Sequence, residues 1–216
     1  MKTVRLIAIC IFITSISKAQ TFSYADIFTA KKVYFYGYDF TNFKLIEAKR
    51  IGKDEKMKSF IFDLIQIMNV KRDEKVFAGY MKKDTVIFSQ DIVNTLNTKI
   101  NKENIIGSQI DVNRHKIPKD SLQLMINKYD TKGLSGIGFV EIIECFYKPK
   151  KETSIWYVFF DISSKKILDT YEGFNRDADS YHGLAEYWSV GVATSMGFYF
   201  NDHYKKVRKV SLKQNK

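Results

Sequence analysis

The segment from Gly136 to Phe174 constrains the fold more than any other part of the chain. It contains two long runs of apolar, β-branched and aromatic residues, GIGFVEIIECFY and TSIWYVFFDI, separated by a short charged turn around Pro149. Such runs, bounded by turn residues, predict a β-hairpin, and a third strand is expected after the turn at 163–165. Apolar side chains occupy odd and even positions alike, so both faces of the hairpin should be covered, as in the centre of a sheet.

An alternating pattern predicts a first strand over Lys32 to Phe40 and places three tyrosines, Tyr34, Tyr36 and Tyr38, on one face of it. A row of tyrosines can serve as a platform on which sugar rings stack. More often such a row packs beneath a helix, with its hydroxyl groups at the edge. Solvent exposure of the row would distinguish a carbohydrate binder from a structural face.

The remaining elements follow from periodicity. A repeat of about 3.6 residues between apolar positions predicts helices over 53–68, 92–100, 118–129 and 184–204, the last one long. Short strands are expected over 75–80, 84–88 and 105–112. This order predicts an α+β or α/β fold with a single mixed sheet, a central antiparallel hairpin and helices packed against it. We expect one domain over residues 20–204, followed by a basic C-terminal tail over 205–216 that is solvated and frayed.

The first 19 residues have the pattern of a signal peptide. Lys2 and Arg5 precede an apolar run from Leu6 to Ile16, and small residues at positions −3 and −1 predict cleavage near Ala19. The apolar run is short for a membrane span, so an uncleaved anchor is the less favoured alternative. We therefore expect a secreted or periplasmic protein that retains no stable membrane span after the signal is removed.

Net charge indicates what kind of partner such a protein attracts. The full chain carries +11, and loss of the three basic residues in the signal segment leaves 32 basic against 24 acidic residues, or +8. This balance favours an envelope protein or an anionic polymer as the partner. Nucleic acid is a poor candidate because the chain is exported. Cys145 is the only cysteine of the mature chain, and its position in an apolar strand predicts a buried, unreactive side chain.

Sequence motifs of several catalytic classes are absent, namely HExxH, GxSxG, the P-loop and CxxC. The acidic loop after Gly173 contains Asp177-x-Asp179, which superficially resembles a calcium loop. Tyr181 occupies the fifth position of such a loop and Trp188 the twelfth, so we expect no metal site. Neither a catalytic residue nor a cofactor is predicted, and a binding protein is favoured over an enzyme.

Glu141 and Glu144 are the acidic residues in the middle of the predicted hairpin. Their odd spacing sends them to opposite faces of a strand, so they do not form a simple pair for glycoside hydrolysis. Glu141 shares its face with Ile143 and Cys145, and it is expected to be a buried structural carboxylate. A dyad of Cys145 and His182 is not favoured, because a thiol inside an apolar strand lacks the electropositive setting that activates it.

Two short motifs stand out in the second half of the chain: Phe160-Asp161-Ile162 with Ile167-Leu168, and Gly183 followed by Glu186-Tyr187-Trp188. With the lysine-rich turn before them, they resemble an uncharacterised family of small exported proteins from the Bacteroidetes group, over about residues 30 to 205. More distantly, the order of elements is similar to exported accessory domains of the LpoB, TolB N-terminal and ABC-transport-auxiliary group. This likeness implies a domain that binds partners in the cell envelope without catalysis.

These observations favour an exported, non-catalytic binding or accessory module of the cell envelope. The alternative is a protein that binds or hydrolyses an envelope glycan, with the loop region 169–188 as its site. Hydrolysis would require Glu141 or Asp161 to share a cleft with Asp179 and His182.

The expected contact surface and the expected structural residues are different sets. The contact surface consists of residues in and after the acidic loop: Asp179, Tyr181, His182, Glu186 and Tyr187. Asp161 is expected to accept backbone N–H groups of the turn that follows it. Structural roles are also expected for three side chains of the core: Trp156, Trp188 and Cys145.

Overall fold

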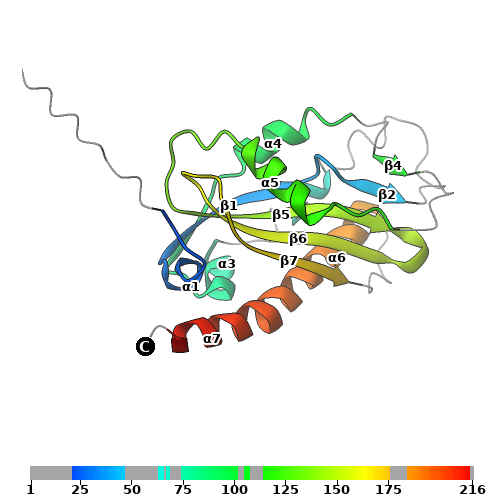
Figure 1. The fold of residues 1–216 in the computed structure, drawn as a ribbon. Coiled ribbons are helices and arrows are strands. Elements are labelled where there is room, and N and C mark those ends of the chain that lie inside the picture. Colours follow the sequence, from blue (N-terminus) through cyan, green and yellow to red (C-terminus); the bar gives the residue numbers. More distant parts are fainter. Residues whose placement is uncertain are drawn as a thin grey trace, which may run out of the picture.

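One mixed β-sheet of seven strands organises the molecule, and helices pack against both of its faces (Figure 1). The computed structural model describes residues 21–46, 63–65, 67–68, 74–101, 105–107, 114–175 and 184–214, of which 106–107, 148 and 184–187 are described by their backbone alone. The fold is of the α+β class, with the single sheet, the antiparallel hairpin and the long C-terminal helix that the sequence predicts.

The strands are β1 (Lys32–Asp39), β2 (Lys44–Ile46), β3 (Thr85–Phe88), β4 (Ile106–Gly107), β5 (Ile137–Tyr147), β6 (Glu152–Asp161) and β7 (Ile167–Asn175). The helices are α1 (Asp26–Thr29), α3 (Glu74–Met81), α4 (Asp91–Asn97), α5 (Lys119–Asn127), α6 (Leu184–Phe198) and α7 (Lys205–Gln214), with a 3₁₀ turn η2 (Lys148–Lys150) and a π-helical segment η3 (Tyr199–Tyr204). Residues 63–65 and 67–68 are helical too, and the rest of the helix predicted over 53–68 lies outside the described residues. In the described part of the chain, no helix has the length and apolar character needed to cross a bilayer.

Strand β5 is the centre of the sheet. One of its edges pairs antiparallel with β6, which pairs in turn with β7. Its other edge is shared end to end by two shorter parallel strands. Strand β1 pairs with β5 as far as Ile142, and β2 pairs with it from Cys145 onward. Beyond them lie β3, parallel to β1, and β4, parallel to β2.

Two hydrophobic cores cover the two faces of the sheet. The larger core lies against α3, η3 and the C-terminal helices and is rich in aromatic rings. Tyr157 of β6 stacks on Tyr199 of η3 with ring centroids 4.3 Å apart, and Trp188 of α6 stacks on Phe146 of β5 at 4.5 Å. The smaller core lies against α4 and α5. The hairpin is therefore covered on both faces, as its apolar composition predicts.

The predicted row of three tyrosines on one face of β1 is wrong. Gly37 has a φ of 91°, a left-handed conformation that glycine adopts without strain, and the pairing of β1 with β5 shifts register between Phe35 and Tyr38. This bulge rotates the strand, so that Tyr36 packs in the smaller core and Tyr38 in the larger one. Both rings are buried, which excludes them as a surface for stacking sugars.

The strand predicted over 75–80 is also wrong, because this segment belongs to helix α3. Its buried residues are Phe77, Ala78 and Met81, and this spacing of one and four positions is helical. Apolar residues at neighbouring positions suit either a strand or a helix in a segment this short, so the periodicity alone could not decide.

The helix predicted over 184–204 continues to Gln214. Helix α6 passes through η3 into α7, which contains most of the residues expected to form a frayed tail. Val207 and Leu212 pack against the larger core, and the Tyr204 hydroxyl donates a hydrogen bond to the carbonyl oxygen of Met81 at 3.0 Å. Apolar residues at helical spacing among the lysines therefore hold this segment on the domain.

Lys83 is a buried lysine between α3 and β3. Its Nζ donates hydrogen bonds to the carbonyl oxygens of Ile27 (2.5 Å) and Ala30 (2.7 Å), at the end of α1. Burial, and to a lesser extent the positive charge of Arg208, lowers the pKa of Lys83 to about 8, against a smaller opposing effect of Asp84. The charged form of this amine is thus less favourable in the folded chain than in water.

The buried amine should make stability depend on pH. The unfolded chain binds the Lys83 proton up to the ordinary pKa of 10.5, whereas the folded chain releases it near 8. The free-energy cost of burying the charged amine therefore decreases as pH rises from about 8 to about 10. We predict that the free energy of unfolding of the wild type rises relative to that of Lys83→Met over this range, measured by urea unfolding. Lys82→Met, at the exposed neighbouring position, controls for the loss of a lysine. A pH-independent difference between the wild type and Lys83→Met would contradict the prediction.

Candidate functional site

On one side of β5, the neighbouring position in the sheet is filled by β1 and then by β2, and the chain leaves the sheet between them. Asp39 ends β1 by accepting hydrogen bonds from the backbone N–H (2.8 Å) and the hydroxyl (2.6 Å) of Thr41. Asn97, at the end of α4, takes the place of a neighbouring strand. Its amide nitrogen donates to the carbonyl of Tyr38 (2.7 Å), and its side-chain oxygen accepts from the N–H of Phe40 (2.9 Å). The break is therefore a fixed structure whose polar backbone groups are satisfied.

Strand β5 carries an irregularity at the same level. Its pairing with β6 shifts register between Ile143 and Cys145, next to the point where β1 gives way to β2. Cys145 packs with Ile46 and Tyr147 instead of joining Ile143 in the larger core. The predicted shared face of Glu141, Ile143 and Cys145 is therefore wrong at Cys145. Bulges of this kind re-aim side chains and are frequent beside binding sites.

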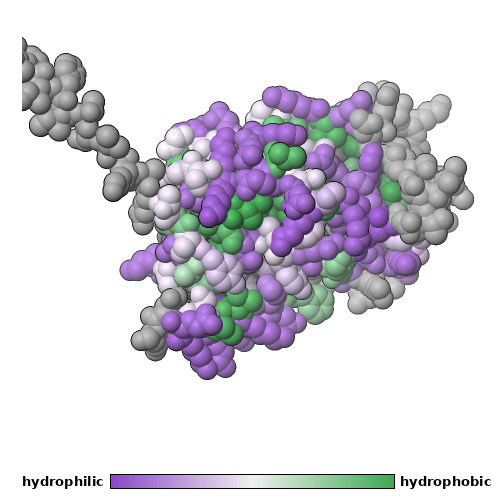
Figure 2. Space-filling model, viewed as in Figure 1, coloured by the Kyte–Doolittle hydropathy of each residue, from purple (hydrophilic) through white to green (hydrophobic). Residues whose placement is uncertain are grey.

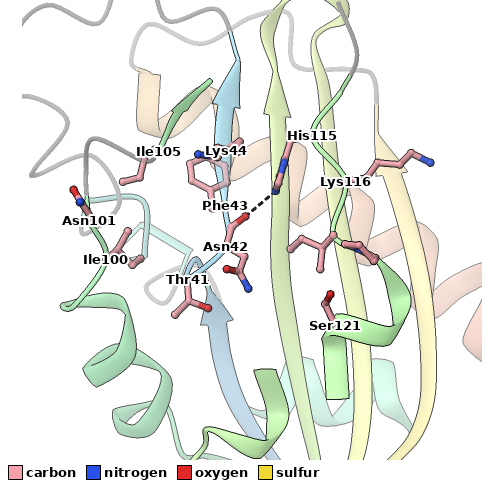
Figure 3. Close-up of a pocket in the computed structure, with 12 residues that line it drawn as sticks. Thr41, Asn42, Phe43, Lys44, Ile100, Asn101, Ile105, His115, Lys116 and Ser121 are labelled. Carbon is pink, nitrogen blue, oxygen red and sulfur yellow. Dashed lines mark hydrogen bonds between the residues drawn. The ribbon is translucent and has the colours of Figure 1, made fainter. Parts of the chain in front are cut away.

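A pocket of about 430 Å³ lies over the break between β1 and β2 (Figure 3). The break between β1 and β2 forms one part of its wall. The residues that follow α4, the residue before β4, and the segment 115–118 with the first turn of α5 form other parts. Of the described residues, twelve line it: Thr41, Asn42, Phe43, Lys44, Ile100, Asn101, Ile105, His115, Lys116, Ile117, Pro118 and Ser121. A volume of this size is within the range of small-ligand sites in proteins.

The lining combines uncharged hydrogen-bonding groups with basic ones. Hydroxyl and amide groups come from Thr41, Asn42, Asn101 and Ser121. The described lining also contains two lysines and no acidic side chain. The Nε2 atom of His115 lies 3.0 Å from the carbonyl oxygen of Asn42, and since a carbonyl only accepts, Nε2 carries the proton in this contact (Figure 3).

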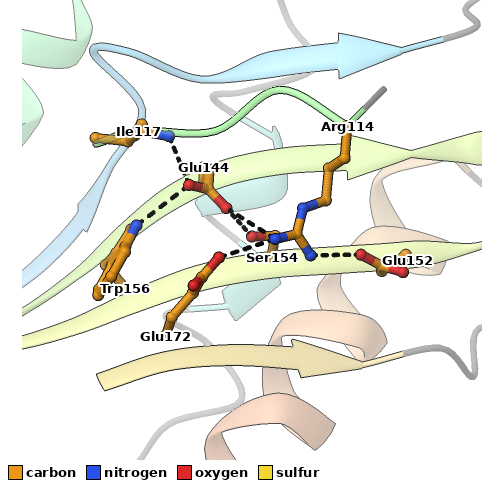
Figure 4. A network of polar contacts seen from close by, with 7 residues as sticks. All are labelled: Arg114, Ile117, Glu144, Glu152, Ser154, Trp156 and Glu172. Atoms are coloured by element: carbon orange, nitrogen blue, oxygen red, sulfur yellow. Dashed lines mark hydrogen bonds and ion pairs between the residues drawn. The ribbon is translucent and has the colours of Figure 1, made fainter. Parts of the chain in front are cut away.

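A buried polar network fixes the wall formed by residues 114–118 (Figure 4). Glu144 of β5 is fully buried, and its carboxylate accepts hydrogen bonds from the backbone N–H of Ile117 (2.6 Å), the indole Nε1 of Trp156 (3.2 Å) and the hydroxyl of Ser154. Arg114 lies beside it, with Nη2 3.9 Å from Glu144 Oε2. The carboxylate thus ties the wall of the pocket to the central strands of the sheet.

Arg114 connects the same segment to the edge of the sheet. Its guanidinium forms ion pairs with Glu152 of β6 (2.6 Å) and Glu172 of β7 (2.8 Å), and it lies over the ring of Phe174 at 3.9 Å from the ring centroid. An arginine suits this position because its planar fork can serve several carboxylates at once. The hydrogen bonds of Glu144 and the ion pairs of Arg114 hold this segment on the sheet, so the network acts as a positioning device for the pocket.

The structure places only part of the predicted contact surface. Asp179, Tyr181 and His182 lie outside the described residues. Glu186 and Tyr187 belong to helix α6, but their side chains lie outside the described part of the molecule. The prediction of a contact site there stays a prediction.

The residues predicted to be structural lie in or beside the core. Asp161 accepts the backbone N–H of Ser163 (2.9 Å) in the turn after β6, and also that of Phe22 (3.1 Å). Trp156 donates to the buried network, and Trp188 is fully buried. Cys145 is buried too, and burial raises the pKa of its thiol to about 12. A thiol with this pKa is not a nucleophile at neutral pH.

Glu141 and Glu144 are both fully buried, and they do not meet. Glu141 lies opposite Tyr157 on β6 and faces the larger core, whereas Glu144 bonds to Trp156 on the other face. Neither Glu141 nor Asp161 lines the pocket at the strand break. Among the described residues, no group of three His, Cys, Asp or Glu side chains could hold a metal ion.

The sequence analysis assigned no role to the segment from Arg114 to Ile117, just before the helix predicted over 118–129. The available signal was Glu144, because a carboxylate inside an apolar strand requires donors from elsewhere in the chain. Nothing in the linear sequence indicates which residues supply them. The backbone N–H of Ile117 and the guanidinium of Arg114 come from 27 and 30 positions away, respectively.

No protein-family model matches the chain, and no curated protein or solved structure is detectably similar to it. The likeness to small exported Bacteroidetes proteins and to envelope accessory domains therefore stays a prediction. Inference about function rests on the geometry and chemistry of the chain's own residues.

The two carboxylates at opposite ends of the network should differ in their effect on stability. Glu144→Gln places an amide NH₂ group where the carboxylate now meets three donors, at a position with no access to water. We predict that it lowers the free energy of unfolding by about 2 to 4 kcal/mol. Glu172→Gln, at the partly exposed end, should cost about 1 kcal/mol or less. Chemical denaturation measures both, and equal costs would show that burial of Glu144 does not determine its contribution.

Proposed function

We propose that the protein is an exported, non-catalytic binding protein of the cell envelope, and that its pocket at the strand break takes an acidic sugar unit of an envelope polymer. The observation that carries this proposal is the chemistry of the lining. Hydroxyl and amide groups are suited to sugar hydroxyls, and the charged side chains of the described lining are lysines, which are suited to a carboxylate or sulfate. Ile100 and Pro118, which line the pocket and are not buried, supply apolar surface for the face of a ring.

The rigidity of the surrounding structure supports binding to a preformed site. Asn97 fixes one wall through two hydrogen bonds to the broken strand, and the Glu144–Arg114 network fixes another. A ligand that enters a preformed pocket does not have to order the protein, so that cost is not subtracted from its affinity. The net charge of +8 expected for the mature chain would also speed the approach of an anionic polymer.

The positions of the carboxylates favour binding over catalysis. Asp39 and Glu144 are the buried acids next to the pocket, and both accept several hydrogen bonds that hold the fold. A general acid would need access to the substrate, whereas both of these side chains are buried and bonded within the fold. A hydrolase that uses the loop region 169–188 remains the alternative function.

Binding can be tested by filling the pocket. Ser121→Phe places a ring in the pocket from the first turn of α5, and Leu124→Phe makes a similar change at an exposed position of the same helix. We predict that the mature protein binds oligosaccharides containing uronic acids, and that Ser121→Phe weakens this binding at least about tenfold while Leu124→Phe leaves it unchanged. Titration calorimetry with acidic oligosaccharides and their neutral counterparts measures both effects. Equal binding of acidic and neutral sugars, or an unchanged affinity of Ser121→Phe, would contradict the proposed site.

The same titrations distinguish binding from hydrolysis. We predict that the bound oligosaccharides are recovered intact, since none of the described residues that line the proposed site is a carboxylic acid. Reducing-end analysis of the mixture after prolonged incubation measures this. Release of new reducing ends by the wild type and by Ser121→Phe alike would favour the alternative, a hydrolase that uses a different surface.

A further inference from the structure

A second recessed surface lies on the other face of the sheet, between helix α3 and the C-terminal helix. It is a groove of about 680 Å³, lined by residues of α3, η3 and α7. The pocket at the strand break is lined instead by residues next to α4 and α5, which cover the opposite face (Figure 1). The two sites therefore share no residue, and both can be occupied at once.

The floor of the groove is apolar. Phe200 of η3 packs against Phe77 of α3, and Tyr80 stacks on Phe200 with ring centroids 6.2 Å apart. Leu212 continues the apolar surface along α7. Two large apolar side chains that line the groove are solvent-exposed, Val76 at 55% and Tyr80 at 37%. Over α7, Figure 2 shows apolar surface set among hydrophilic side chains.

The rim of the groove is basic. Its described lining contains four cations, Lys82, Lys205, Arg208 and Lys209, and no acidic side chain. Beneath it, the buried amine of Lys83 is held by carbonyl oxygens, and the charge of Arg208 opposes its protonation. Positive charges thus accumulate at this place, and a negatively charged partner would relieve their repulsion.

The shape of the groove favours a particular kind of occupant. A membrane surface is flat, whereas this apolar surface is recessed between two helices. A third helix can pack along two others with its ridges in their groove and its apolar side chains on the floor. Acidic residues on the flanks of such a helix would meet the four cations of the rim.

We infer that this groove docks an acidic amphipathic helix of a partner protein. Apolar side chains at positions i and i+4 of that helix contact Val76 and Tyr80, and glutamates or aspartates beside them pair with Arg208 and Lys209. The protein would then connect an envelope polymer, on one face of its sheet, to a protein partner on the other.

Gly79 offers a way to close the groove without a change in charge. It lies in α3 and lines the groove, and a Cβ atom at this position would meet no other atom within 4 Å. Gly79→Leu therefore fills the groove from its wall. Because glycine is an unfavourable residue inside a helix, the substitution should not destabilise the fold.

The experiment uses a labelled, designed 16-residue peptide with leucines on one helical face and glutamates on both flanks. A peptide of the same composition in scrambled order, and vesicles containing anionic lipid, serve as the other two probes. Fluorescence anisotropy with the mature protein should show binding of the amphipathic peptide at least about tenfold tighter than of the scrambled one. The double charge reversal Arg208→Glu with Lys209→Glu should weaken that binding at least about tenfold, and so should Gly79→Leu.

A matched control reverses two charges of the same helix outside the groove. Lys206→Glu with Lys213→Glu changes the net charge equally, and neither residue lines the groove. This variant should bind the amphipathic peptide within about threefold of the wild type. Ser121→Phe, on the opposite face, should leave the binding of this peptide unchanged.

Several outcomes would overturn the inference. Equal binding of the amphipathic and the scrambled peptide would show a nonspecific charge effect. An equal loss of affinity in the groove and control variants would show the same. Binding of the vesicles alone, with sensitivity to Arg208→Glu and Lys209→Glu, would identify the surface as a membrane contact instead.

Discussion

The fold depends on the requirement that strand β5 be paired along both edges and covered on both faces. Every one of its residues is buried, so an unpaired N–H or carbonyl group there would be costly. One edge is satisfied by the long strand β6. The other is satisfied by two short strands placed end to end, and the point where they meet leaves a break beside a bulge in β5. The pocket that we consider the functional site lies over this break.

A break in a central sheet must be stabilised by other groups, and polar side chains supply that stabilisation here. Asn97 pairs with the backbone of the interrupted strand, Asp39 turns the chain, and Glu144 collects three donors inside the sheet. Arg114 then links the covering segment to strands β6 and β7. Because each of these polar groups is buried or nearly so, loss of one partner leaves the others unsatisfied.

The two recessed surfaces differ in chemistry, although the charged side chains described on both are basic. The pocket at the strand break is small and lined by hydroxyl and amide groups, which suits a polar ligand. The groove beside α7 is larger, with an apolar floor of aromatic rings, which suits a segment of a protein. The C-terminal helix makes the second surface possible, because apolar residues among its lysines hold it against the domain. Both surfaces are combined in the adaptor that we propose, in which one face of the sheet binds a polymer and the other a protein.

The sequence by itself determined the elements whose signal is local. The apolar runs of 137–147 and 152–161 predict the central hairpin, and the turn after Asp161 is set by its own carboxylate. Helical periodicity identified α4, α5 and α6, but it did not identify α3, whose short apolar run suits two structures. Tertiary structure decided the rest. The bulges at Gly37 and near Cys145 rotate side chains to faces that strict alternation does not predict, because the register depends on the neighbouring strand. The pocket depends on contacts of Asn97, Arg114 and Glu144 with segments far away in the sequence. Such contacts form only when the whole sheet is assembled, and for that reason no local pattern could reveal them.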